Sequence, residues 1–282
     1  MQTFQQVQAM QNWCKEKKKQ GLTIGIVTTM GFLHEGHLSL VRQARLQCDI
    51  VVVSIFVNPI QFGQGEDFED YPRNIDRDSA LLEAEKVDAI FAPTAREMYP
   101  VGYNTYVQVD GEISQKLCAK SRPCHFKGVA TVVSKLFHIC LADKAFFGQK
   151  DAQQVMVIEK MVRELNFPLD IVRVPIVREK DGLALSSRNV YLNEEERQEA
   201  LVLSRSLQAA GDLIRSGEYN VANLKQRIRE IITRSPLAEV DYIEIYDGND
   251  LADIKEIKGR ALIALAVRFG KTRLIDNLLV EV

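Results

Sequence analysis

Apolar residues in the first 175 positions group in two ways that alternate along the chain. Short β-branched runs predict buried strands over residues 23–28, 49–57, 88–92, 144–147 and 169–174. Apolar residues at helical spacing predict helices over residues 3–20, 38–47, 76–86, 128–141 and 151–165. Thr3 is expected to cap the first helix and Gly21 to end it. The alternation favours an α/β fold, a Rossmann-like parallel sheet with helices on both faces and a ligand crevice at the carboxyl ends of its strands.

The pattern changes after about residue 177, just beyond a break marked by Pro175. Asn193 and Glu196 have the spacing of a capping box, which indicates the start of a helix. Two helices and three strands are expected from there on, over residues 194–215, 221–234, 240–246, 261–269 and 272–278. Helices followed by strands indicate a smaller C-terminal α+β domain. The expected domains are therefore residues 1–176 and 177–282.

Composition excludes several classes of protein. Lys and Arg number 36 against 38 Asp and Glu, and the net charge of −2 argues against a nucleic-acid partner. The five cysteines are odd in number and form no CxxC pair, which favours free thiols in a reducing compartment. The longest apolar run, near residues 50–57, is far shorter than the ~20 residues that span a bilayer. The N-terminus lacks the apolar core of a signal peptide. We therefore expect a soluble, cytoplasmic protein without a membrane partner.

Two histidines lie in a glycine-flanked turn between the first strand and the second helix. The segment reads Thr-Met-Gly-Phe-Leu-His-Glu-Gly-His and ends at His37. Gly31 and Gly36 permit a ligand to approach the backbone closely, and the helix that follows offers free N–H groups to an anion. His34 and His37 can both face that anion. The alternatives are two ordinary surface histidines or a zinc site, but the H-E-G-H spacing is one residue short of the H-E-x-x-H zinc motif.

Three further polar segments are predicted to lie near the same crevice. Asn58 and Gln61 follow a buried strand, and their amides can bind a carboxylate or a hydroxyl. The segment 148–151 (Gly-Gln-Lys-Asp) follows another strand and offers a lysine to phosphate. Residues 186–188 (Ser-Ser-Arg) offer two hydroxyls and a guanidinium. Each segment alone is also typical of a solvated loop or a helix cap.

Together these segments resemble known families. His34-Glu-Gly-His37 resembles the HxGH signature of the nucleotidyltransferase superfamily, which includes class I aminoacyl-tRNA synthetases, and residues 184–189 resemble its KMSKS-type loop. The four segments in this order, with Asp70-Tyr-Pro-Arg73 and residues 122–133, resemble the pantothenate synthetase family over nearly the whole chain. Thr28, Gln149 and Cys124 depart from the residues usual there.

The resemblance implies an ATP-dependent ligase that uses Mg²⁺ and joins pantoate to β-alanine through a pantoyl adenylate, releasing pyrophosphate and AMP. It also implies a homodimer. The implied nucleotide site comprises Met30, Gly31, Phe32, Leu33, His34, Glu35, Gly36, His37, Gly148, Gln149, Lys150, Asp151, Val177, Leu185, Ser186, Ser187 and Arg188. The implied catalytic groups are His34, His37, Lys150, Ser186, Ser187 and Arg188. The substrate-binding residues would be Asn58, Gln61 and Gln154, and Asp78 is a candidate for the Mg²⁺ region.

Three rival interpretations are less well supported. Another HxGH enzyme, such as a phosphopantetheine adenylyltransferase, would be shorter and would lack the Asn58–Gln61 and Leu185–Asn189 combination. A tRNA synthetase is disfavoured by the small size and the absence of a basic surplus. A non-catalytic nucleotide-binding module would not need both histidines together with Lys150. Because an acyl adenylate is hydrolysed by water, we further expect the C-terminal domain to act as a lid.

Overall fold

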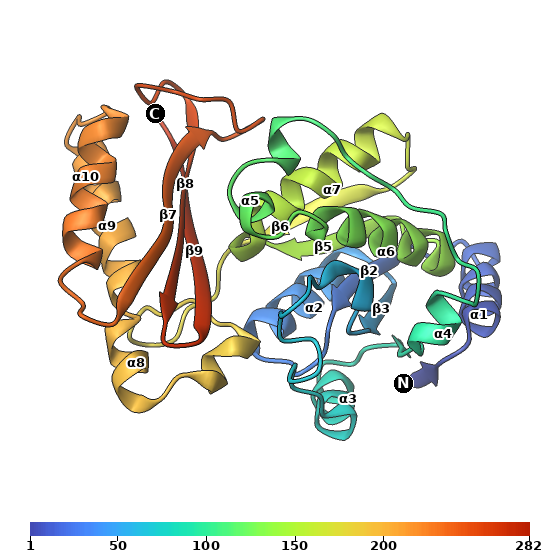
Figure 1. The fold of residues 1–282 in the computed structure, drawn as a ribbon. Helices are drawn as coiled ribbons and strands as arrows, with labels where there is room; N and C mark the ends of the chain where they lie inside the picture. The colour runs from blue at the N-terminus through green and yellow to red at the C-terminus, as the bar shows by residue number, and fades with distance from the viewer.

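A six-stranded parallel sheet forms the larger part of the molecule (Figure 1). The computed structural model describes residues 1–282. The strands are β1 (Gln2–Phe4), β2 (Ile24–Thr29), β3 (Ile50–Ile55), β4 (Ala89–Phe91), β5 (Lys144–Gly148) and β6 (Asp170–Val174). Their order is β1-β4-β3-β2-β5-β6, and every neighbouring pair is parallel. The predicted α/β fold class is confirmed.

Helices cover both faces of this sheet because its strands are apolar on both sides. In β3, Val52 packs with α1 (Val7–Lys19), α6 (His125–Cys140) and α7 (Ala152–Glu164), whereas its neighbour Val53 packs with α2 (Glu35–Gln47) and α3 (Ile75–Ala84). The remaining short helices are α4 (Ala95–Met98), α5 (Cys118–Ser121), and 3-10 turns at Pro59–Gln61, Glu112–Ser114, Gln149–Asp151 and Ser187–Tyr191. No helix combines the length and apolarity that a membrane span needs.

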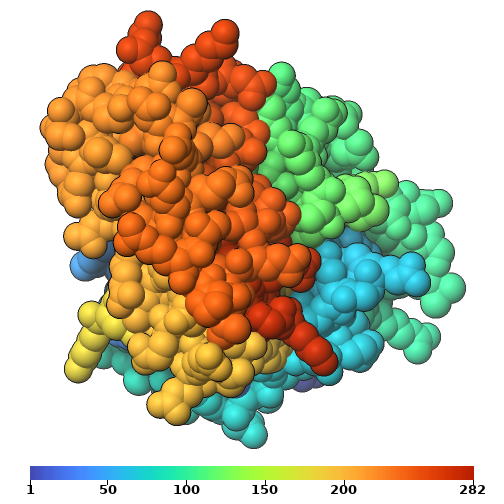
Figure 2. All heavy atoms as spheres, turned by 60° about the vertical axis from the view of Figure 1, so that its left-hand side comes forward, coloured from blue at the N-terminus to red at the C-terminus, as the bar shows by residue number.

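The C-terminal residues build a second, antiparallel sheet of three strands: β7 (Ala238–Asp247), β8 (Arg260–Phe269) and β9 (Thr272–Glu281). Helices α9 (Val202–Arg215) and α10 (Val221–Ile232) cover its outer face, where Ile263 is buried. Ala264 on the opposite face packs toward the parallel-sheet part. Figure 2 shows the orange and red C-terminal residues lying directly against the green and cyan N-terminal ones. The division at residue 176 remains a prediction.

The predicted start of the first helix is wrong. Gln2–Phe4 form β1, which pairs with β4 at the edge of the sheet, so Thr3 caps no helix. Helix α1 begins at Val7, whose backbone N–H donates to Oε1 of Glu97 at 2.7 Å. The capping group thus comes from a residue 90 positions away, and local sequence cannot reveal it.

Other element boundaries also differ from the expected ones. The helix expected over residues 194–215 is divided into α8 (Glu194–Glu199) and α9, although Asn193 and Glu196 form the predicted capping box. Helix α6 begins at His125, three residues earlier than expected. Helix α2 begins at Glu35 rather than at Leu38, because His34 and His37 cap its N-terminus.

Candidate active site

A cleft opens at the carboxyl ends of β2, β3, β5 and β6. From β2 the chain adds β3 on one side of the sheet, whereas from β5 it adds β6 on the other side. The boundary between β2 and β5 is therefore the switch point at which open α/β sheets bind ligands. Its empty volume is about 1360 Å³ when the open mouth is included. The predicted residues that line it are Met30, His34, Gly36, His37, Asn58, Gln61, Gly148, Lys150, Asp151, Gln154, Val177, Leu185, Ser186, Ser187 and Arg188.

The two histidines form the N-terminal cap of α2. The backbone N–H of Gly36 donates to Nδ1 of His34 at 3.1 Å, and that of His34 donates to Nδ1 of His37 at 3.3 Å. This reciprocal capping extends α2 back to Glu35. Because each Nδ1 accepts a hydrogen bond, the proton of each neutral ring lies on Nε2. The ring centroids are 4.0 Å apart, so the pair offers two neighbouring N–H donors.

Burial keeps both imidazoles neutral. It is the largest cause that lowers the pKa of His34 to about 4, with the Lys150 ammonium as the second. Burial, followed by the neighbouring His34, also lowers the pKa of His37 well below its ordinary value. An entering phosphate chain would therefore meet uncharged donors, with Lys150 supplying positive charge beside them.

Backbone geometry explains the residues between the two histidines. A side chain at position 36 would place its Cβ 2.9 Å from the His34 ring, so only glycine fits there. Gly31 adopts φ +86°, which favours glycine. The buried carboxylate of Asp78 accepts the backbone N–H groups of Phe32 (2.7 Å) and Leu33 (2.8 Å) and so holds the turn in place.

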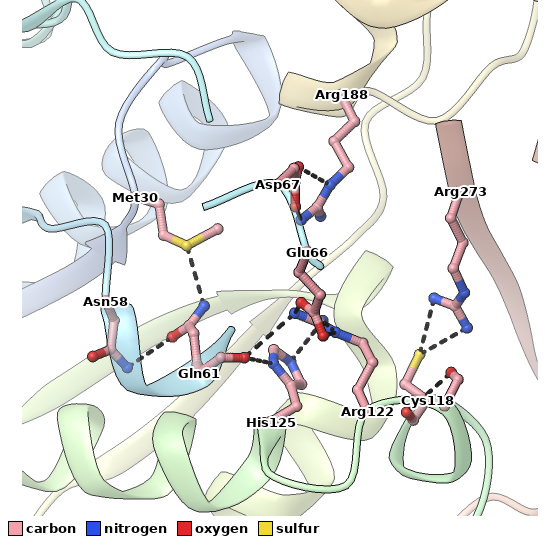
Figure 3. A network of polar contacts seen from close by, with 11 residues as sticks. Met30, Asn58, Gln61, Glu66, Asp67, Cys118, Arg122, His125, Arg188 and Arg273 are labelled. Carbon is pink, nitrogen blue, oxygen red and sulfur yellow. Dashed lines mark hydrogen bonds and ion pairs between the residues drawn. The ribbon is translucent and has the colours of Figure 1, made fainter. Parts of the chain in front are cut away.

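The amide of Gln61 is held by a chain of hydrogen bonds. Its Oε1 accepts from Nδ2 of Asn58 at 3.1 Å, and its Nε2 contacts the Met30 sulfur at 3.1 Å (Figure 3). Tyr99 donates its hydroxyl to Oδ1 of Asn58 at 2.7 Å. Helix α6 packs closely against Gln61. A Cβ at Gly128 would lie only 2.5 Å from Cα of Gln61. The amide is therefore oriented before any ligand binds.

Arg122 and His125 also line the cleft, although the sequence analysis gave them no role. Nδ1 of His125 lies 3.0 Å from the Gln61 carbonyl, and its Nε2 lies 3.2 Å from Nη1 of Arg122 (Figure 3). The Arg122 guanidinium is paired with Glu66. Burial, then Arg122, lowers the pKa of His125 to about 4. An arginine just before a largely apolar helix and a histidine at its first position were the signal that could have found them.

The loop at residues 186–188 reaches the cleft from the C-terminal side. Ser187 donates to the Phe32 carbonyl at 3.3 Å, and Ser186 caps the turn that follows it. The Arg188 guanidinium forms two bonds of 2.8 Å with the Asp67 carboxylate (Figure 3). The loop thus contacts both the histidine turn and the segment that follows β3.

Some predicted site residues lie outside the cleft. Leu33 is fully buried in the core, Glu35 pairs with Arg42 on the surface, and the side chain of Gln149 bonds to Asn277. Gly31 and Phe32 contribute the backbone of the turn that Asp78 holds, and Asp78 itself faces away from the main cleft.

The acidic residues fit only one way of holding a magnesium ion. No group of three His, Cys, Asp or Glu side chains is arranged to bind a metal. Asp78 already accepts two backbone N–H groups, and Asp151 is the acidic side chain that lines the cleft. Mg²⁺ is commonly held by one or two carboxylates together with substrate phosphates. The chain is suited to a cation that arrives with a nucleotide.

The arrangement defines a class of protein. A parallel sheet carries paired imidazole donors at a helix N-terminus, a lysine beside them and a Ser-Ser-Arg loop opposite. These are the kinds of donor that suit a phosphate chain, and the arrangement resembles that of the HxGH nucleotidyltransferases.

Comparisons with known proteins give the family. The family model "Pantoate-beta-alanine ligase" matches residues 2–279. The pantothenate synthetases of Syntrophomonas wolfei and Heliobacterium modesticaldum are 64% and 57% identical over 282 residues, the full length of each chain. The chain belongs to the pantoate–β-alanine ligase family. The predicted family and ligase activity are confirmed.

Solved structures agree with this assignment. Pantothenate synthetase from Thermus thermophilus superposes with a TM-score of 0.94 at 45% identity, with 99% of each chain covered. A pantoate-beta-alanine ligase from Francisella tularensis, complexed with Beta-gamma ATP and Beta-alanine, superposes with a TM-score of 0.81 at 34% identity. That match covers 99% of this chain and 97% of the other.

Proposed function

We propose that this cleft condenses pantoate with β-alanine at the expense of ATP, through a pantoyl adenylate. The observation that carries the proposal is the pair of Nε2–H donors of His34 and His37, which share one cleft with the oriented amide of Gln61. The histidine pair supplies a phosphate site, and the Gln61 amide supplies a site for a carboxylate or a hydroxyl. The Francisella relative, complexed with Beta-gamma ATP and Beta-alanine, supports both ligands.

The first step joins pantoate to the nucleotide. A carboxylate oxygen of pantoate, held by Asn58, Gln61 and Gln154, attacks the α-phosphorus of ATP, and the bond to the pyrophosphate oxygen breaks. Negative charge grows on the phosphate oxygens during this step. The groups placed to meet that charge are His34, His37, Lys150, Ser186, Ser187 and Arg188. Mg²⁺, bound chiefly through the phosphates near Asp151, would neutralise part of the same charge.

The second step uses the adenylate as an activated acid. The β-alanine amine, as the free base, attacks the acyl carbon; the carbon–oxygen bond to AMP breaks, and the amine gives up a proton. Water must be kept out meanwhile, and we propose that residues 177–282 act as a lid that carries the 186–188 loop. We further propose a cytoplasmic homodimer, since symmetric dimers are the commonest assembly of such enzymes.

The test is an assay for AMP and pantothenate formed from ATP, pantoate and β-alanine with Mg²⁺. His37→Ala and Lys150→Ala should each lower kcat by about 10²-fold or more, because each removes a donor to the developing charge. His138→Ala and Lys127→Ala are matched controls, since both side chains are exposed on α6. Failure of the wild type to release pyrophosphate, or wild-type turnover in His37→Ala, would contradict the proposal.

A further inference from the structure

Two consecutive residues of β9 bond to the two loops that we assign to phosphate binding. Strand β9 is one of the two edge strands of the C-terminal sheet, yet Asp276 and Asn277 are only 2% and 4% exposed. Consecutive side chains of a strand point to opposite faces of its sheet. Here one of the two reaches residues 148–151 and the other reaches the segment that leads to Ser186.

The side chain of Asn277 bonds to backbone carbonyls of the loop at residues 148–151. Its Nδ2 donates to the carbonyl oxygens of Gln149 (3.0 Å) and Lys150 (2.9 Å), and its Oδ1 accepts from Nε2 of Gln149 at 3.2 Å. Those carbonyls lie in the 3-10 turn between β5 and α7. The carboxamide supplies both N–H groups that these carbonyls require, and thereby fixes the backbone from which Lys150 projects into the cleft.

The side chain of Asp276 holds the segment at residues 178–188 through the Arg178 guanidinium. Its carboxylate accepts two hydrogen bonds from Arg178, at 2.6 and 2.9 Å, and a third from the backbone N–H of Asn277 at 2.8 Å. Arg178 also donates to the Gly182 carbonyl at 3.1 Å. The isolated bridge between Arg178 and Ala184 then brings the chain directly to Ser186.

We propose that Asp276 and Asn277 are positioning residues that hold loops 148–151 and 178–188 in fixed register from a single strand. Lys150 and the Ser186–Arg188 group then enter the cleft as one unit. This proposal rests on the proposed function, in which both loops contact the nucleotide. Asp276 and Asn277 line a smaller pocket that adjoins the main cleft and shares Lys150, Ser186 and Arg188 with it. Their side-chain polar atoms already bond to the two loops, so we assign them a role that acts through the loops.

A double-mutant cycle tests the proposal. Asn277→Ala should lower kcat/KM for ATP by about tenfold or more, because small misplacements of a catalytic group can cost up to 10²-fold. If Asn277 acts through Lys150, adding Asn277→Ala to Lys150→Ala should change kcat/KM by less than about twofold. Asp276→Asn is tested in the same way against Arg188→Ala. Asn277→Ser, which cannot span both carbonyls, replaces Asn277→Ala if that variant does not fold.

Ile263→Val is the matched control, because it loosens the apolar core of the same sheet and removes no polar contact to either loop. It should lower the melting temperature without changing kcat/KM for ATP. Normal kcat/KM in Asn277→Ala, or an equal loss with and without Lys150, would overturn the proposal while leaving the proposed function intact. Wild-type activity in Lys150→Ala would overturn the proposed function and this inference together.

Discussion

The imidazole of His34 performs two tasks with its two nitrogens. Nδ1 accepts the Gly36 N–H that begins α2, and this leaves the proton on Nε2, facing the cleft. The same division applies to His37. Helix capping and the proposed binding of phosphate thus depend on one hydrogen-bonding arrangement, so that a change at either histidine should disturb both.

The lowered pKa values predict how stability depends on pH. His34 has a pKa of about 4 in the folded protein against 6.5 ordinarily, so unfolding takes up protons between these values. The stability due to the neutral ring is complete above pH 6.5 and is lost as the pH falls toward 4. In His34→Asn, the melting temperature should therefore fall less between pH 7 and pH 5 than in the wild type. His138→Ala is the control; equal slopes in wild type and His34→Asn would contradict the argument.

At the residue scale, the sequence revealed groups whose chemistry is local. The histidine turn and the lysine and serine segments could be identified because spacing and flanking glycines carry their signal. Asn277 could not, because its role arises from contacts with the carbonyls of residues 149 and 150. Asp78 could be recognised as relevant but not as a backbone acceptor, since its partners lie 45 and 46 residues away.

At the element scale, the packing of α6 against the 3-10 turn at residues 59–61 fixes the position of Gln61, whose amide we propose to bind pantoate. The two elements meet at Gly128, where a Cβ would lie 2.5 Å from both Cα of Gln61 and the Ile60 carbonyl oxygen. Both neighbours are backbone atoms, which cannot move aside as a flexible side chain can. The helix can approach this closely only because residue 128 is glycine.

Gly128→Ala should therefore destabilise the protein and impair pantoate use. Alanine usually favours a helix over glycine by about 1 kcal/mol, but overpacking here should cost about 1–3 kcal/mol. Thermal unfolding and the KM for pantoate measure the two effects, with Gln61→Ala as the reference for loss of the amide. Gly211→Ala in α9 is the control, since its Cβ would meet only the ends of two flexible side chains, Leu278 at 3.3 Å and Arg215 at 3.5 Å. An unchanged pantoate KM in Gly128→Ala would refute this account.

The type of an element was predictable where the apolar residues recur with a clear period. The end of an element was not predictable where a residue far along the chain determines it. Strands β2, β3 and β5 lie where the β-branched and aromatic runs place them. Strand β1 is only three residues long and exists by pairing with β4. The start of α1 depends on Glu97, and the start of α2 depends on a histidine acting as a cap.

At the scale of the whole molecule, the alternation of strands and helices was enough to predict the class of fold, because parallel strands need crossovers and right-handed ones restrict the order. The position of the C-terminal sheet against the parallel-sheet part was not predictable from this alternation. It is held to the parallel-sheet part by specific polar contacts, among them Arg188 with Asp67 and Asn277 with residues 149–150. Those pairs join positions more than 100 residues apart.

The same contacts show what a lid motion would have to break. Opening of the proposed lid would break the Ser187–Phe32 and Asn277–Lys150 bonds, and closure over the bound ligands would re-form them. We therefore expect the distance between the two parts to change when an ATP analogue and pantoate bind. The distance can be followed by energy transfer between dyes at Leu46→Cys and Ala222→Cys. Cys124 is first replaced by serine, because it is exposed whereas the other four thiols are buried. An efficiency that stays constant at saturating concentrations of both ligands would show that residues 177–282 do not move as a lid.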